Sequence, residues 1–225
     1  MPSRADYKNT WNELAQTPEE AFLYVGGTRD EAELDATAVH AINVLRATVG
    51  INPTDDFVEI GCGVGRVGKA LSGIVKTWTG CDASGAMVSH ANRRLESYAN
   101  AKAIEVSGHD LQPLADASFD VVYSTVVFMH LDEWDRYRYV QEAMRILRPG
   151  GRFFCDNISI TTENGWAYFQ QHCESFKPLE RPTHIAKCST PQELTIYLER
   201  AGFTGVQTRE RDLWVDAWGI KPAAS

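Results

Sequence analysis

Short apolar runs and one-sided helical patterns alternate along this chain. Ala38, Ile42, Leu45 and Val49 recur at helical spacing and predict a helix over residues 35–49. An apolar run then predicts a strand over residues 56–60. Further strands are predicted over 77–81, 103–106, 119–127, 152–157, 205–210 and 213–219, and further helices over 65–72, 84–98, about 133–147 and 190–202. Strands that alternate with helices predict an α/β fold with a parallel sheet covered on both faces.

The length of 225 residues fits a single domain, and no segment is long enough to be a linker between two. Within residues 1–225 we expect an amino-terminal helical cap (1–50), a ligand-binding core (51–157), and a carboxyl-terminal helix with a strand pair (189–220). Residues 158–188 between them are aromatic and polar with no clear period. They predict either a lid over a ligand or a small apolar cluster beneath a long loop.

Composition and net charge indicate which partners and compartments to expect. The apolar fraction of 44% and the charged fraction of 23% are ordinary for a globular protein. The net charge of −8 makes nucleic acid a poor partner, because nothing neutralises phosphates. Five cysteines without a Cys-x-x-Cys pair predict reduced thiols and no metal site. There is neither a signal-like amino terminus nor an apolar run of 18 residues, so we expect a soluble, cytoplasmic protein without a membrane span. The sequence leaves the oligomeric state open.

The turn after the first strand is the most informative segment. Glu59 precedes three glycines at alternate positions, Gly61, Gly63 and Gly65. A strand that runs into a backbone without side chains brings its main chain close to a bound ligand. The adjacent carboxylate favours a ligand with positive charge rather than a bare phosphate. S-adenosylmethionine, which carries an ammonium and a sulfonium but no phosphate, fits this combination.

Two other kinds of nucleotide-binding site, the dinucleotide site and the P-loop, are disfavoured because residues that they require are absent. The dinucleotide fingerprint G-x-G-x-x-G needs a glycine or alanine where this chain has Arg66, which disfavours an NAD-dependent oxidoreductase. A P-loop needs a serine or threonine directly after its lysine, and here Lys69 is followed by Ala70.

Two further carboxylates follow predicted strands. Asp82 ends the second strand, where it could accept both ribose hydroxyls of an adenosine or simply cap the next helix. Asp110 follows the third strand and could accept from an adenine amino group, although a loop role is the simpler alternative.

The chain as a whole resembles the class I S-adenosylmethionine-dependent methyltransferases. The resemblance covers about residues 55–157 and 189–219, and is nearest to the small-molecule branch of ubiquinone and menaquinone methyltransferases, with a type 11-like methyltransferase domain. It is carried by Val58-Glu59-Ile60-Gly61-Cys62-Gly63-Val64-Gly65, Cys81-Asp82-Ala83-Ser84, Asp110-Leu111, Phe119-Asp120-Val121-Val122, Arg145-Ile146-Leu147-Arg148-Pro149-Gly150-Gly151-Arg152 and Thr190-Pro191-Gln192-Glu193-Leu194 with Ala201-Gly202-Phe203.

This resemblance implies a three-layer Rossmann-like fold. Its sheet would have seven strands, mostly parallel, with an antiparallel last strand inserted beside the sixth. It also implies that Glu59 and the glycine turn hold the methionine portion and that Asp82 holds the ribose. The other implied cofactor-binding residues are Asp110 and Leu111 at the adenine, Ser124 and Thr125 at the sulfonium, and Arg66, Ala83 and Met87. Ser124 and Thr125 could equally be small residues tolerated in a buried strand.

The implied reaction moves a methyl group to an oxygen or nitrogen atom of a small organic molecule. Aligning the reactants supplies most of the acceleration, and a base is needed only if the acceptor enters protonated. His130 is the candidate base, since an ordinary histidine pKa of about 6.5 suits that task. A capping or lining role is the alternative. The acceptor pocket is expected to include Tyr24, Met129, Trp166 and Phe169.

Other aromatic residues are expected to help enclose the cofactor and the acceptor. Tyr168, His172 and Phe176 would complete the lid, while Trp11 and Phe22 would fold over the cofactor from the amino-terminal side. A regulatory protein that binds S-adenosylmethionine without turnover is the competing function.

Overall fold

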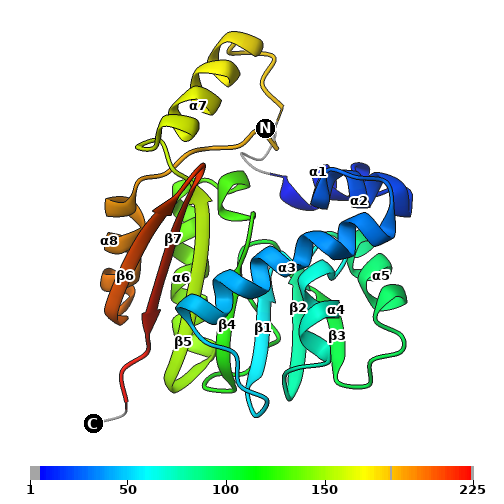
Figure 1. The fold of residues 1–225 in the computed structure, drawn as a ribbon, viewed down its shortest axis with the longest axis vertical. Helices are drawn as coiled ribbons and strands as arrows, with labels where there is room; N and C mark the ends of the chain where they lie inside the picture. Colours follow the sequence, from blue (N-terminus) through cyan, green and yellow to red (C-terminus); the bar gives the residue numbers. More distant parts are fainter. Residues whose placement is uncertain (1–5, 183, 224–225) are drawn as a thin grey trace.

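The chain forms one seven-stranded sheet in the order β3-β2-β1-β4-β5-β7-β6 (Figure 1). The structure is a computed structural model that describes residues 6–182 and 184–223. The strands are β1 Asp56–Ile60, β2 Thr77–Asp82, β3 Ala101–Glu105, β4 Phe119–Ser124, β5 Leu147–Ile158, β6 Thr204–Arg211 and β7 Trp214–Ile220. β7 runs antiparallel to both of its neighbours, β5 and β6. The predicted mostly parallel sheet with an antiparallel last strand is therefore confirmed.

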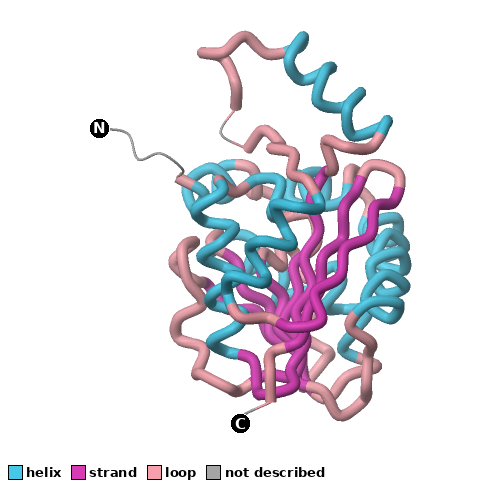
Figure 2. The backbone as a smooth tube through the Cα atoms, turned by 90° about the vertical axis from the view of Figure 1, so that its left-hand side faces the viewer, coloured by secondary structure: helices cyan, strands magenta, loops and turns pink. Residues whose placement is uncertain are grey.

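Helices cover both faces of this sheet, as the Rossmann-like prediction requires. They are α1 Tyr7–Glu13, α2 Pro18–Gly26, α3 Glu31–Thr48, α4 Arg66–Ser72, α5 Gly85–Arg94, the short η1 Phe128–His130, α6 Glu133–Ile146, α7 Glu163–Ser175 and α8 Pro191–Ala201. Figure 2 shows the sheet edge-on between two helical layers. None of the helices within the described residues is long and apolar enough to cross a membrane.

Two apolar clusters hold the three layers together. Val58 and Ile60 of β1 pack on the side of α6 and α8, whereas Phe57 packs on the side of α3, α4 and α5. Every residue of β1 is buried, which explains why its sequence lacks the polar alternation of a half-exposed strand. The carboxyl ends of β1, β2 and β4 consequently form one rigid edge of the sheet.

The helix predicted over 35–49 begins earlier than expected, at Glu31. Asp30 caps it by accepting the Glu33 N–H at 2.9 Å, and Leu34 of the first turn is fully buried. The inward residues Ala38, Ile42, Leu45 and Val49 are all buried, as predicted. The division of the chain into cap, core, lid and carboxyl-terminal segments stays a prediction.

The structure corrects two other expectations. The strand predicted to reach residue 127 ends at Ser124, because Val126 adopts a φ of 63° that no strand accommodates. Residues 158–188 were read as aperiodic but contain α7, capped by Thr162. Gly165 is the only buried residue of that helix, so no apolar stripe marks it in the sequence. α7 stands away from the rest of the fold, beyond the carboxyl ends of the parallel strands (Figures 1 and 2).

Candidate active site

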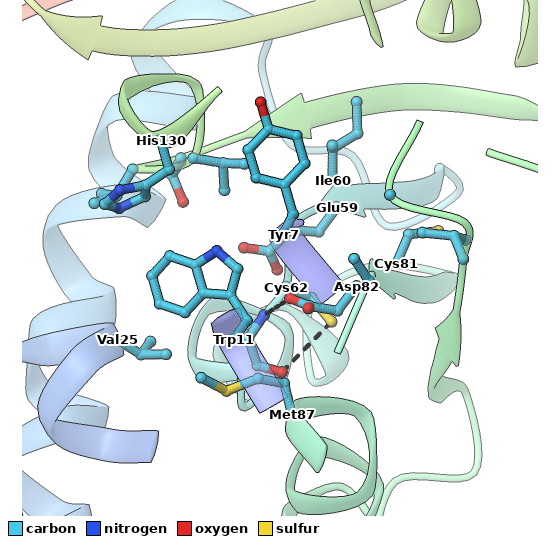
Figure 3. Close-up of a pocket in the computed structure, with 18 of the residues that line it drawn as sticks. Tyr7, Trp11, Val25, Glu59, Ile60, Cys62, Cys81, Asp82, Met87 and His130 are labelled. Atoms are coloured by element: carbon cyan, nitrogen blue, oxygen red, sulfur yellow. Dashed lines mark hydrogen bonds between the residues drawn. The ribbon is translucent and has the colours of Figure 1, made fainter. Parts of the chain in front are cut away.

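A cavity opens at the carboxyl ends of β1, β2 and β4, where the sequence places its motifs. The space between its walls is about 920 Å³, which includes open solvent at its mouth. Its lining residues are Tyr7, Trp11, Tyr24, Val25, Glu59, Ile60, Gly61, Cys62, Gly63, Arg66, Cys81, Asp82, Ala83, Met87, Val106, Gly108, Leu111, Thr125, Val126, Val127, His130, Leu131 and Tyr139. Trp11, Glu59 and Asp82 point toward its centre (Figure 3).

The glycine turn passes too close to its neighbours for side chains. Gly61 has a φ of 70°, and a Cβ there would lie 2.4 Å from Cγ2 of Val127. Gly63 has a φ of 52°, and a Cβ there would lie 2.8 Å from Cγ2 of Val25. Both positions therefore require glycine for their backbone angle and for the space. The result is a bare stretch of main chain along the cavity wall.

Glu59 lies beside this turn with only 3% of its surface exposed. Its Oε2 accepts the Tyr123 hydroxyl proton at 2.7 Å, and that hydroxyl oxygen accepts from Trp78 Nε1 at 2.9 Å. Burial raises the pKa of Glu59 to about 8, despite the Tyr123 hydrogen bond and the nearby Arg66 charge, which both lower it. The carboxyl is thus partly neutral when alone and can ionise beside an incoming cation.

Asp82 joins the end of β2 to the glycine turn. Its Oδ2 accepts the Gly63 N–H at 2.8 Å and its Oδ1 accepts the Ser84 N–H at 2.9 Å. Burial raises its pKa, and the backbone donors oppose that shift. Each carboxylate oxygen can accept a second hydrogen bond, so the group can still bind a diol in the cavity.

Two polar atoms in the cavity wall are buried without a hydrogen-bond partner. They are Thr125 Oγ1 and Arg66 Nε. Buried polar atoms are nearly always satisfied, so both atoms are available for a hydrogen bond to a group bound in the cavity. Arg66 is also the one arginine or lysine among the described residues that line the cavity.

His130 lies on η1 at the other side of the cavity. Its Nδ1 is 2.8 Å from the His184 carbonyl oxygen, which can only accept, so Nδ1 carries the proton and Nε2 is left with a lone pair. The ring meets the Trp11 indole edge-on at 5.0 Å. Burial lowers the pKa of His130 to about 4, so the ring is neutral at pH 7. This environment replaces the ordinary value assumed from the sequence.

Twelve of the residues predicted for the site or its cap line this cavity together. They are Trp11, Tyr24, Glu59, Gly61, Gly63, Arg66, Asp82, Ala83, Met87, Leu111, Thr125 and His130. The fold therefore brings these residues into one site. The role of each residue stays a prediction.

Three predicted cofactor residues lie outside the lining. Gly65 caps α4, with its Cβ position facing Leu95 at 3.2 Å. Asp110 accepts from the Ser107 hydroxyl at 3.0 Å and is held within its own loop. Ser124 is fully buried, and its hydroxyl donates to the Ile60 carbonyl at 3.3 Å. For Asp110 and Ser124, the cofactor role and its alternative both stay predictions.

Four expected pocket or cap residues also lie elsewhere. Trp166 and Phe169 sit on α7 with 48% and 36% of their surfaces exposed, and neither contributes to the lining. Met129 is outside it as well and offers its carbonyl to the Lys187 N–H at 2.6 Å. Phe22 is buried in a separate cluster beneath α2. Trp166 and Phe169 are outside the lining because α7 stands away from the sheet.

Two tyrosines of the cavity were missed by the sequence analysis. Tyr7 on α1 donates to Asp135 Oδ2 at 2.7 Å and accepts the Asp132 N–H at 3.0 Å, which fastens α1 across the cavity. Tyr139 on α6 is 5% exposed and lines the cavity. Tyr139 belongs to the buried side of α6 together with Val140, Ala143 and Ile146, and the helical spacing of these residues in the sequence could have identified it.

Comparison with known proteins agrees with this geometry. A family model described as a methyltransferase domain matches residues 58–155. A probable S-adenosylmethionine-dependent methyltransferase of Mycolicibacterium smegmatis is 31% identical over 66% of this chain and 51% of its own length. The ubiquinone biosynthesis O-methyltransferase of Pseudomonas fluorescens is 28% identical over 77% of each chain. A solved Thermotoga maritima structure, an S-adenosylmethionine-dependent methyltransferase and possible histamine N-methyltransferase, superposes with a TM-score of 0.61 at 23% identity, covering 83% of this chain and 89% of that one.

The fold and site define a nucleoside-binding α/β domain of the Rossmann-like type. Residues 58–155 form a methyltransferase domain, and the cofactor that this family implies is S-adenosylmethionine. It spans about half the length of the mycobacterial relative.

Proposed function

We propose that this protein transfers the methyl group of S-adenosylmethionine to an oxygen or nitrogen atom of a small organic molecule. The observation that carries the proposal is one cavity with two unlike halves. One half holds the buried carboxyl Glu59 and the part-buried carboxyl Asp82 beside a bare glycine turn, and the other holds Trp11, Tyr24 and His130. The first half fits a cationic nucleoside, and the second fits an apolar acceptor.

The residues of the first half fit the cofactor. Glu59 would pair with the ammonium and Arg66, with its unsatisfied Nε, with the carboxylate of the methionine portion. Asp82 would accept the ribose hydroxyls, while Leu111 would pack on the adenine. Thr125, with its unsatisfied Oγ1, would face the sulfonium. When bound, the cofactor supplies an electrophilic methyl group on a good leaving group.

The chain's own residues contribute orientation, exclusion of water and proton removal. Tyr7 and Trp11 of α1 lie over the cavity and hold the acceptor in a fixed place, which is the main source of acceleration in such a transfer. His130 would take the proton of a hydroxyl or ammonium acceptor on Nε2, since Nδ1 is committed to the His184 carbonyl. The ring is neutral at pH 7 and can accept a proton without first losing one, but the burial that lowers its pKa also makes it a weaker base than an ordinary histidine.

The acceptor half also limits what the acceptor can be. Trp11, Tyr24 and Leu131 give it aromatic and apolar walls, and a net charge of −8 opposes nucleic acid. These features support a small, largely apolar molecule with one hydroxyl or amino group. The cytoplasmic location expected from the sequence stays a prediction.

We also propose that α7 closes over the cavity when the acceptor is bound. The rings of Trp166 and Phe169 lie 5.5 Å apart on a helix whose only buried residue is Gly165. Folding this pair onto the mouth of the cavity would cover apolar surface and exclude water. Replacing both rings with alanine would then raise the KM for the acceptor and leave the affinity for S-adenosylhomocysteine unchanged.

Transfer of a labelled methyl group to a panel of phenols, carboxylic acids and amines tests the proposed reaction. Wild type should label at least one class, and His130→Ala should lose turnover while keeping its affinity for S-adenosylhomocysteine. Binding without labelling of any acceptor class would favour a non-catalytic regulatory protein. A variant that keeps wild-type turnover across pH would remove His130 from the reaction.

A further inference from the structure

The turn after β4 holds a valine in a strained backbone conformation. Val126 has a φ of 63°, in the left-handed region where a β-branched side chain is rarely found. The turn of Thr125, Val126 and Val127 lines the cavity and leads directly into η1, which carries His130. Val127 also packs against the backbone of Gly61. The conformation at Val126 therefore sets where three parts of the cavity wall lie.

Asp156 of β5 provides the hydrogen bond that this conformation needs. Its Oδ1 accepts the Val126 N–H at 2.6 Å, and the residue is only 3% exposed. The charged groups around it come from three elements: Arg211 of β6, with Nη2 3.6 Å from Oδ2, Asp216 of β7 and Arg66 of α4. Burial raises the pKa of Asp156 to about 7, and the Val126 N–H and the two arginines oppose that shift.

A buried carboxyl against a strained turn needs a reason, since both are costly. Without an acceptor at Oδ1, the Val126 N–H would be unsatisfied and the valine would relax toward an extended conformation. Thr125 would then leave the cavity wall, because adjacent backbone angles place its side chain.

We propose that Asp156 is a positioning residue, which accepts the Val126 N–H and so holds the Thr125–Val127 turn in the shape that binds the cofactor. Asp156 itself touches no ligand in this account, since it is absent from the cavity lining. The inference rests on the proposed function only in taking the cavity as the cofactor site.

A double-mutant cycle separates this role from general destabilisation. Glycine adopts a positive φ without support, so Val126→Gly removes the need for the hydrogen bond. Asp156→Ala should weaken S-adenosylhomocysteine binding, measured by titration calorimetry, by about 10-fold in the wild-type background, because fewer molecules keep the competent turn. In the Val126→Gly background, the same change should cost less than about 2-fold.

The conservative variant tests the acceptor atom. Asp156→Asn keeps an oxygen at the same place and should bind within about 3-fold of wild type. Asp55, a buried carboxyl paired with Arg152 at the opposite end of the sheet, is the matched control. Asp55→Ala should lower the melting temperature without changing affinity.

Two results would overturn the proposal. Equal losses on Asp156→Ala in both backgrounds would show that it acts through charge and not through the turn. Asparagine as weak as alanine would show that the acceptor oxygen is irrelevant.

Amide hydrogen exchange at Val126 decides the question without any ligand. We expect slow exchange in the wild type and in Asp156→Asn, and exchange at least about 10-fold faster in Asp156→Ala. Unchanged protection would refute the positioning role. A wild type that protects this amide yet fails to bind S-adenosylhomocysteine would instead contradict the proposed cofactor site.

Discussion

The raised pKa of Glu59 predicts that cofactor affinity depends on pH. Only an ionised carboxylate attracts the ammonium of the methionine portion, whereas burial favours the protonated form in the free protein. Binding must therefore release the proton from Glu59 at any pH below about 8. Glu59→Gln, which keeps an acceptor for the Tyr123 hydroxyl but cannot ionise, removes this step.

The size of the effect follows from the pKa. With a pKa of about 8, about one tenth of the free protein carries the carboxylate at pH 7. The apparent dissociation constant for S-adenosylhomocysteine should therefore fall about 10-fold for each pH unit between about 5.5 and 7.5, where the ligand's ammonium stays protonated. Glu59→Gln should bind more weakly than the wild type at pH 7.5, with little dependence on pH.

Titration calorimetry measures both parts of this prediction. Repeating the titration in buffers of different ionisation enthalpy counts the protons released, and we expect close to one for the wild type at pH 6.5 and none for Glu59→Gln. Asp156 also has a pKa of about 7, so the variant identifies the group responsible. A wild-type affinity that is flat below pH 7.5 would refute the pairing of Glu59 with the ammonium.

Three further predictions concern the same edge of the sheet. Asp82→Asn places an amide donor against a backbone N–H and should weaken S-adenosylhomocysteine binding at least about 10-fold by calorimetry; unchanged affinity would exclude a ribose role. Gly61→Ala should abolish binding, or folding as judged by circular dichroism, whereas Gly150→Ala, with a φ of 79° and open space around it, should cost only about 1 kcal/mol. Because the folded-state pKa values of Glu59 and Asp156 are raised, the unfolded chain loses these protons first. These two carboxyls should thus lower the free energy of unfolding as pH rises from about 4.5 to 8, by up to about 1.4 kcal/mol per unit for each group. His130, whose pKa is lowered to about 4, acts in the opposite sense up to about pH 6.5 and offsets one of them, so the steepest fall is expected between about pH 6.5 and 7; a rise from about pH 6.5 to 8 in urea titrations would contradict the prediction.

Most strands and helices could be predicted from patterns of neighbouring residues. β1 was predicted at its observed bounds because its apolar residues Phe57, Val58 and Ile60 lie directly before the glycine turn. The helix α8 was equally clear, with Thr190 as its cap, Pro191 in its first turn and Gly202 after its end. These signals are encoded in neighbouring residues, so no knowledge of the tertiary fold is needed to see them.

The missed features have no such local signal. α7 lacks an apolar stripe, since it packs on nothing that would require one. Tyr7 reaches the cavity only because its hydroxyl bonds to Asp132 and Asp135, more than a hundred residues away. Likewise, nothing near Val126 announces that Asp156 will support its backbone from the next strand.

The sequence by itself determined the seven strands with the helices α3, α4, α5, α6 and α8, the bare glycine turn, and the two carboxyls, Glu59 and Asp82, that flank it. These follow from short-range constraints, in which a backbone angle or an apolar period depends on adjacent residues. The tertiary structure alone decided which side chains share the cavity and how each one titrates. Both are set by burial and by contacts between distant segments: burial raises the pKa of Glu59 and lowers that of His130, and no stretch of neighbouring residues specifies how deeply either is buried.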